Sequence, residues 1–188
     1  HKVYSKRIVE KNDVITIAKP LDALKKVAAT AKISGLNPYI LSDSMEGEAK
    51  DLAKFQSAIV KQIINNNQSF SKPALLLSGG ETTVTLQNKI DGRGGRNTEF
   101  LLSLAIELEE YKNFSAIACD TDGKDGTEEN AGAFIDHNTI KNAKILGMDP
   151  LKFLSDHNSF EFFKNLGDLI VSGPTFTNIN DFRAILIV

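Results

Sequence analysis

The sequence predicts an α/β fold: a three-layer α/β/α arrangement with a mostly parallel sheet and some antiparallel edge strands. Two observations lead to this class. Strand-like and helix-like apolar patterns alternate along almost the whole chain, as they do where helices connect parallel strands. Residues 73–77 form a continuous apolar run, which is typical of a strand buried on both faces. We therefore expect a single domain over residues 1–188. Residues 73–188 carry most of the motifs described below, and residues 1–72 precede them.

The first half of the chain contains two expected helices and two expected short strands. A β-branched run at 14–18 predicts the first strand, and apolar residues at helical spacing from Leu21 predict a helix that Gly35 ends. A short strand at 39–41 comes next. Apolar positions on one face then predict a long helix over about 46–64, and the polar run that follows it predicts a loop.

The second half continues the alternation. After the strand at 73–77, Ser78, Gly79 and Gly80 resemble a tight turn, and residues 82–86 alternate like another strand. The remaining expected elements are, in order, a loop at 91–96, a helix from Asn97, a strand at 116–119, a loop at 120–130, an extended segment at 132–135, helices at 139–146 and 159–166, a strand at 169–171, a loop at 173–181 and a last strand at 184–188.

Composition excludes several classes of protein. The 188 residues are 41% hydrophobic and carry a formal net charge of −2 without a basic stripe, so we expect no nucleic acid partner. No apolar run approaches the ~18 residues that cross a bilayer, and no signal peptide is evident, so we expect no membrane association. A single cysteine fits a reducing cytoplasm. Because the chain begins at His1 without an initiator Met, we expect a piece of a longer protein or a tag remnant.

Four polar, glycine-rich segments follow predicted strands. Ligands in open α/β sheets bind beyond the carboxyl ends of the strands, so the joint occurrence of these segments is the main indication of a site. They are Ser78-Gly79-Gly80-Glu81-Thr82-Thr83, Asp91-Gly92-Arg93-Gly94-Gly95-Arg96-Asn97, Asp120-Thr121-Asp122-Gly123-Lys124-Asp125-Gly126 and Ser172-Gly173-Pro174-Thr175-Phe176-Thr177-Asn178.

The arginine-containing segment is a candidate anion site. Its three glycines permit close backbone approach to a ligand, and Arg93 and Arg96 can make bidentate bonds to phosphate or carboxylate. The helix beginning at Asn97 would point its N-terminal N–H groups at the same place. The alternative is a hairpin-like loop with solvated arginines and Asn97 as the helix N-cap.

The other segments are less specific. Glu81 can orient a hydroxyl or a cation, or it can be an ordinary surface carboxylate. The loop with Asp122 and Asp125 lacks the spacing of an EF-hand. It can still help to hold Mg²⁺, which needs only one or two carboxylates besides substrate phosphates. Local Asx-turns, in which the carboxylates bind nearby backbone N–H groups, explain these residues equally well. No P-loop motif is present, and the absence of a G-x-G-x-x-G motif weakens a dinucleotide reading.

Several single residues favour structural roles. Asp156 and Asn158 stand near an expected helix start and are typical caps. His137 and His157 lack partners at metal-ligand spacing, which favours surface or capping positions. Cys119 ends a strand and is expected to be a small core residue rather than a nucleophile.

The ordered set of motifs resembles the MOFRL region, the C-terminal part of the glycerate 2-kinase family, members of which are also labelled hydroxypyruvate reductases. The resemblance covers about 37–188. It is carried by Gly79-Gly80-Glu81-Thr82-Thr83, Gly92-Arg93-Gly94-Gly95-Arg96-Asn97-Thr98-Glu99-Phe100, Thr121-Asp122-Gly123-Lys124-Asp125-Gly126 and Gly173-Pro174-Thr175-Phe176-Thr177-Asn178-Ile179-Asn180-Asp181, with support from Leu41-Ser42-Asp43-Ser44-Met45-Glu46-Gly47-Glu48-Ala49.

This resemblance implies ATP-dependent phosphorylation of glycerate with Mg²⁺, in a cleft between this part and an N-terminal domain that the chain lacks. It implies catalytic roles for Arg96, Glu81 and Asp122, and it makes Asp122 and Asp125 the metal-ligand candidates. The implied substrate- and phosphate-binding residues are Gly79, Gly80, Arg93, Gly95, Asn97, Asp125, Thr175, Asn178 and Asp181. A homodimer is left open.

Two residues depart from the family pattern. Thr98 stands where Gln is usual, and Phe176 stands where a small residue, commonly Gly, is usual. Two other functions also stay open at this point. One is a reductase acting on hydroxypyruvate, and the other is a non-catalytic α/β module that binds an anion.

Overall fold

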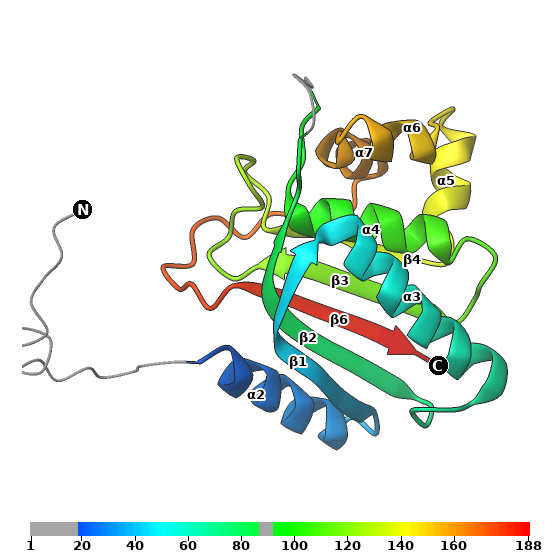
Figure 1. Cartoon of the computed structure of the whole chain (residues 1–188), viewed down its shortest axis with the longest axis vertical. Coiled ribbons are helices and arrows are strands. Elements are labelled where there is room, and N and C mark those ends of the chain that lie inside the picture. The colour runs from blue at the N-terminus through cyan, green and yellow to red at the C-terminus, as the bar shows by residue number, and fades with distance from the viewer. Residues whose placement is uncertain (1–18, 87–91) are drawn as a thin grey trace, which may run out of the picture.

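The computed structural model describes residues 19–86 and 92–188 of the chain (Figure 1). The strand expected at 14–18 lies outside these ranges. None of the helices in the described part combines the length and apolar character that crossing a bilayer requires.

The described strands form one six-stranded sheet. Its spatial order is β1 (Asn37–Glu48), β2 (Ala74–Thr83), β6 (Asp181–Ile187), β3 (Phe114–Asp120), β4 (Gly132–Asp136) and β5 (Leu169–Ile170). Only β1 and β2 pair in parallel; the other neighbours in this sheet are antiparallel. The α/β class is therefore confirmed, whereas the expectation of a mostly parallel sheet is wrong.

Two connections explain this difference. The segment between β3 and β4 is a loop without a helix, so the chain returns antiparallel beside the strand it has just left. The last strand, β6, then enters between β2 and β3 and runs opposite to both. Alternation of strand and helix patterns does not reveal where a final strand inserts.

One edge of the sheet nevertheless gathers the polar ends of several strands. Since β2 and β3 both run opposite to β6, they run in the same direction as each other, and β6 begins where they end. Gly80 and Asp120 are each in register with Asp181 across the sheet. The predicted gathering of polar segments at the carboxyl ends of strands thus holds for β2 and β3 of this mixed sheet.

Helices cover both faces of the sheet in three layers (Figure 1). Helix α2 (Pro20–Ile33) lies on one face against β1 and β2, and α3 (Ala49–Asn66) and α4 (Arg96–Glu107) lie on the other. Beyond α4 lie α5 (Thr139–Ile145), α6 (Pro150–Ser155) and α7 (Ser159–Leu166), of which α6 was not expected.

The apolar strand β2 holds these layers together. Leu75 and Leu77 pack with Leu24 of α2, and Leu76 points to the opposite face, among the side chains of α3 and α4. This alternation of direction within a continuous apolar run is what burial on both faces requires.

The turn expected at Ser78-Gly79-Gly80 is wrong, because β2 continues through these residues to Thr83. Gly80 has φ +133°, and a Cβ there would lie 2.1 Å from the Met45 carbonyl oxygen of β1. Glycine at this position therefore allows the backbone of β1 to pack closely against β2. Strand β1 is also longer than the expected 39–41. Its pairing with β2 shifts register after Ile40 and Ser42, so apolar and polar residues do not simply alternate along its sequence.

Candidate functional site

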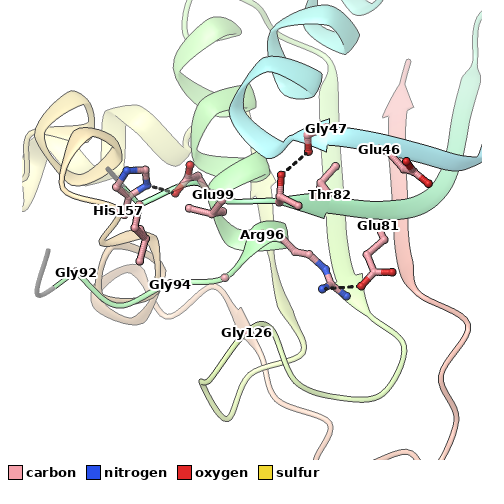
Figure 2. Close-up of a pocket in the computed structure, with 14 residues that line it drawn as sticks. Glu46, Gly47, Glu81, Thr82, Gly92, Gly94, Arg96, Glu99, Gly126 and His157 are labelled. Carbon is pink, nitrogen blue, oxygen red and sulfur yellow. Dashed lines mark hydrogen bonds and ion pairs between the residues drawn. The ribbon is translucent and has the colours of Figure 1, made fainter. Parts of the chain in front are cut away.

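A pocket of about 720 Å³ opens at the polar edge of the sheet (Figure 2). Its walls come from the ends of β1 and β2, the glycine-rich segment before α4, the first turns of α4, and the residue between α6 and α7. The lining residues are Glu46, Gly47, Glu81, Thr82, Thr83, Val84, Leu86, Gly92, Gly94, Gly95, Arg96, Glu99, Gly126 and His157.

Arg96 is the cationic group of this pocket. Its Nε–H donates to Asp181 Oδ1 at 2.7 Å, its Nη2 donates to Asp120, and its Nη1 lies 3.6 Å from Glu81 Oε1. Burial alone would lower the pKa of Arg96, but the bond to Asp181 and the surrounding carboxylates raise it. The side chain stays charged and is still 24% exposed, so it is fixed in direction and open to a ligand.

Asp181, the first residue of β6, connects the side chains around Arg96. Its side chain is fully buried. Besides Arg96, its Oδ1 accepts the Asn97 side-chain amide at 2.8 Å. Its Oδ2 accepts from the Thr82 backbone N–H at 3.2 Å and from Arg183 at 2.6 Å. The predicted residues Arg96, Asn97 and Asp181 are therefore brought together.

Asp120, the last residue of β3, begins one of the predicted polar segments but was not among the predicted site residues. Its carboxylate is paired with Arg96, and its Oδ1 accepts the backbone N–H of Asp122 at 3.1 Å. Burial raises the pKa of Asp120 to about 6, despite that backbone bond and the charge of Arg96. Its position at the end of a buried strand is the feature of the sequence that could have identified it as a site residue.

Asp125 caps α4 rather than facing the pocket. Its Oδ1 accepts the Asn97 backbone N–H at 2.9 Å and its Oδ2 accepts that of Thr98 at 2.8 Å. The helix begins at Arg96 with Gly95 as its N-cap, and a Cβ on Gly95 would lie 2.2 Å from Asp125 Cγ. Gly95 thus makes room for a carboxylate that satisfies the free N–H groups of the helix. Thr98 supports the same cap through its hydroxyl.

Arg93 does not share the pocket with Arg96. Its guanidinium is paired with Glu128 and Glu161 and lies 4.5 Å from the ring centroid of Phe160. Its backbone N–H donates to Asn158 Oδ1 at 3.0 Å, so Asn158 holds this segment instead of capping α7 by its side chain. The geometry gives Arg93 a structural role in docking the glycine-rich segment against α7, and the predicted ligand contact does not fit its position.

Glu99 and His157 form a second pair at the other end of the pocket (Figure 2). His157 Nδ1 lies 2.8 Å from Glu99 Oε2, and both side chains are largely buried. Burial raises the pKa of Glu99 against the opposing influence of His157. The expected surface or capping position of His157 is therefore wrong, and nothing in the local sequence pointed to a partner 58 residues away.

Of the other predicted residues, Glu81 lines the pocket, whereas Asp122, Thr175 and Asn178 do not. Glu81 is 60% exposed on the pocket side of Arg96 (Figure 2). Asp122 Oδ1 accepts the Lys124 N–H at 2.8 Å, which is the Asx-turn arrangement. Asn178 makes a similar local bond to Asn180. Thr175 ties the last loop to the Asp122 carbonyl oxygen at 3.1 Å.

Two more predictions concern small residues. Gly79 lies within β2, and a Cβ there would meet the Asp181 carbonyl oxygen at 3.2 Å. Close packing of strands thus accounts for Gly79, as it does for Gly80, and neither glycine lines the pocket. Cys119 is half-buried, and burial raises the pKa of its thiol to about 11, which agrees with the expected non-nucleophilic role.

The donor set gives limited support to a metal site. Both oxygens of Asp125 already accept hydrogen bonds in a fully buried position, so this carboxylate does not fit the predicted Mg²⁺ ligand. Asp122 is half-buried at the loop surface, and its role as a ligand stays a prediction. In the part of the chain that the structure describes, no three His, Cys, Asp or Glu side chains are grouped as a metal site.

Comparison with known proteins places these features in context. Residues 74–181 match the sequence model of the MOFRL family. A protein of Agrobacterium vitis, provisionally named hydroxypyruvate reductase, is 46% identical over 175 residues, or 93% of this chain. The glycerate 2-kinase of Pyrococcus horikoshii is 40% identical over 154 residues, or 82% of this chain.

A solved structure gives the same picture. The crystal structure of a glycerate kinase from Thermotoga maritima superposes with a TM-score of 0.89 at 36% sequence identity and covers 94% of this chain. The match covers only 42% of that structure. Likewise, the chain spans 40% of the Agrobacterium protein and 34% of the Pyrococcus kinase. The chain therefore corresponds to less than half the length of these relatives.

Proposed function

Because the chain belongs to the MOFRL family, we propose that it is the C-terminal part of a glycerate 2-kinase, which transfers a phosphoryl group from ATP to the 2-hydroxyl of glycerate. The observation that carries the proposal is the position of Arg96: a partly exposed guanidinium, aimed into the pocket by fixed carboxylates. The names of the Pyrococcus and Thermotoga relatives support the reaction class.

Phosphoryl transfer depends mainly on positioning and on neutralising charge. Arg96 binds the glycerate carboxylate or the transferring phosphoryl group at its exposed edge. Glu81, on the adjacent rim, accepts a hydrogen bond from a substrate hydroxyl or from metal-bound water. The buried contacts of Arg96 with Asp181 and Asp120 hold it in place before the ligand arrives, so little conformational freedom is lost on binding.

ATP and Mg²⁺ belong to this proposal. A bound Mg²⁺ would supply positive charge that offsets the charge of the phosphates. Asp122, which is partly exposed, is the candidate residue of this chain for holding the ion. The open pocket and the missing length relative to the relatives support a second, N-terminal domain that faces Arg96 and completes the cleft. A cytoplasmic enzyme fits these cofactors.

The assignment of Arg96 is tested in the full-length protein. Steady-state ADP release from Mg-ATP with D-glycerate is measured for Arg96→Ala and for Lys112→Ala, which removes an exposed cation far from the pocket. We expect a loss of about 100-fold or more in kcat/KM for Arg96→Ala, as for other fixed groups that stabilise developing charge, and little change for Lys112→Ala. Equal effects of the two substitutions would sink the assignment.

A reductase acting on hydroxypyruvate is the second candidate, favoured by the name of the Agrobacterium relative. The chain has no G-x-G-x-x-G motif, which weakens a dinucleotide site in this part. Fluorescence titration with NADH and NADPH separates the two functions. Saturable binding together with hydroxypyruvate-dependent oxidation would favour the reductase, and the kinase proposal predicts neither.

A further inference from the structure

Arg183 is a fully buried arginine on the central strand β6. It is in register with Ser78 of β2 and Ala118 of β3, and its relative exposure is 0%. Its Nη2 donates to Asp181 Oδ2 at 2.6 Å and to Thr82 Oγ1 at 2.8 Å. On the side of α4, its Cζ lies 5.2 Å from the ring centroid of Phe100.

This arginine is poorly explained as a stabilising residue. Its Nε and Nη1 have no hydrogen-bond partner among the residues that the structure describes. Burial lowers the pKa of Arg183 below its ordinary value, which reflects the cost of keeping the charge away from water. An apolar side chain of similar volume would avoid that cost. The role of Arg183 therefore depends on the side chains that it binds, above all Asp181.

Asp181 connects Arg183 to the pocket. One carboxylate oxygen, Oδ2, binds Arg183, and the other, Oδ1, binds Arg96 at 2.7 Å and the Asn97 amide at 2.8 Å. Because a carboxylate is a rigid planar group, fixing Oδ2 also fixes the direction of Oδ1. The orientation of Arg96 thus depends on a residue that the pocket does not contain.

Charge strengthens this dependence. Arg183 offsets the negative charge of Asp181 from the buried side. Without it, Arg96 alone offsets the Asp181 carboxylate, so the positive potential at the exposed edge of Arg96 is weaker. An anionic ligand approaching Arg96 then meets a more negative site and binds more weakly.

We propose that Arg183 is a positioning residue, which holds the Asp181 carboxylate so that Arg96 stays aimed at, and available to, the carboxylate or phosphate group of the ligand. The inference rests on the proposed function in that it concerns the same anion site. It adds to the proposed site a buried side chain that does not itself contact the substrate.

The test compares three variants of the full-length protein. Arg183→Met removes the charge, Arg183→Lys keeps it in a side chain with fewer donors, and Ile185→Ala removes packing from a 1% exposed residue on the same face of β6. The apparent affinities for D-glycerate and for inorganic phosphate are measured by protection against thermal unfolding. Kinase activity is measured in parallel, with kcat and KM determined separately.

We expect Arg183→Met to weaken the protecting affinity about tenfold or more, the size found when outer contacts of a binding residue are lost. Arg183→Lys should recover part of this loss. Ile185→Ala should lower the unfolding temperature without changing the affinity. In an active enzyme, the Arg183→Met loss should appear mainly in KM if Arg96 binds the ground-state carboxylate.

Several outcomes overturn the inference. Arg183→Met could bind both anions like the wild type, or Ile185→Ala could weaken binding as much as Arg183→Met does. Absence of protection in the wild type would also overturn it, because there would be no anion site to position. If Arg183→Met does not fold, the comparison of Arg183→Lys with Ile185→Ala decides. Protection without glycerate-dependent ADP release would leave the inference standing and reject the kinase proposal alone.

Discussion

The carboxylate of Asp125 accepts two hydrogen bonds from Thr98, one from its backbone N–H at 2.8 Å and one from its hydroxyl at 2.8 Å. This contact fixes the start of α4 and hence the direction in which Arg96 leaves the helix. Asp125, one of the two residues predicted to hold Mg²⁺, therefore acts on the site indirectly, through the geometry of the helix end.

Replacing Asp125 with Ala should destabilise the fold, because buried donors of α4 lose their acceptor. We expect a loss of about 2 to 3 kcal/mol in the free energy of unfolding, measured by urea denaturation. Asp149→Ala is the matched control, since the exposed Asp149 carboxylate accepts the backbone N–H groups of Leu151 and Lys152 at the start of α6. Its loss should cost about 1 kcal/mol. Similar losses in both variants would contradict the buried cap.

The pKa of Asp120, about 6, predicts that anion affinity depends on pH. Protonation below that pKa removes a negative charge beside Arg96, so D-glycerate, which stays ionised, should bind several-fold more tightly at pH 5 than at pH 7. Calorimetric titration across this range measures the effect. Asp120→Asn should flatten the profile, and Asp51→Asn on the exposed face of α3 should not. A flat wild-type profile would exclude Asp120 from the site.

Phe176 has φ +57° and a side chain that is 98% exposed. A bulky residue is strained in this backbone region, which glycine adopts without such strain. Phe176→Gly should therefore raise the free energy of unfolding by roughly 0.5 to 1 kcal/mol. Phe176→Ala removes the same ring but keeps the Cβ, so it should give no such gain in thermal denaturation. A stabilised Ala variant would show that the ring, not the backbone, is responsible.

Glu81 is expected to matter for activity and not for stability. Its contact with Arg96 is long, at 3.6 Å, and exposed, and ion pairs of that kind contribute about 0 to 1 kcal/mol. Glu81→Ala should leave the unfolding temperature nearly unchanged and lower kcat/KM for glycerate about 10-fold or more. Glu109→Ala breaks another surface pair, with Lys144, and should change neither quantity. Full activity in Glu81→Ala would remove Glu81 from the proposed mechanism.

Local patterns predicted the helices other than α6, and the apolar first half of β2. Helical spacing from Leu21 predicted α2, and the apolar run at 73–77 marked the strand that separates two halves of the core. The sheet direction was missed because strand pairing is a long-range property: β6 inserts between strands that come from distant parts of the chain. The turn expected at Gly79 and Gly80 was missed because close strand packing also demands glycine.

The site was predictable where chemistry and position coincide. Glu81 lies near the end of β2, Arg96 begins α4 and Asp181 begins β6, and the structure brings the three together at one sheet edge. Arg93 was indistinguishable from Arg96 in the sequence, since both stand in the same glycine-rich segment. Only the fold places Glu128 and Phe160 beside it.

The buried partners were harder to find. Arg183 did leave a signal: it is an arginine two residues before Ile185 in an apolar strand, and therefore on the same inward face. The pair of Glu99 and His157 left none, because their contact depends on how α6 and α7 pack against α4.

The central claim, a kinase acting on glycerate, is tested most directly by ADP release from Mg-ATP by the full-length protein with and without D-glycerate. The account predicts release that depends on glycerate and is lost in Arg96→Ala. Release that is absent in both conditions, or that is the same with and without glycerate, from a protein shown to be folded, would contradict it.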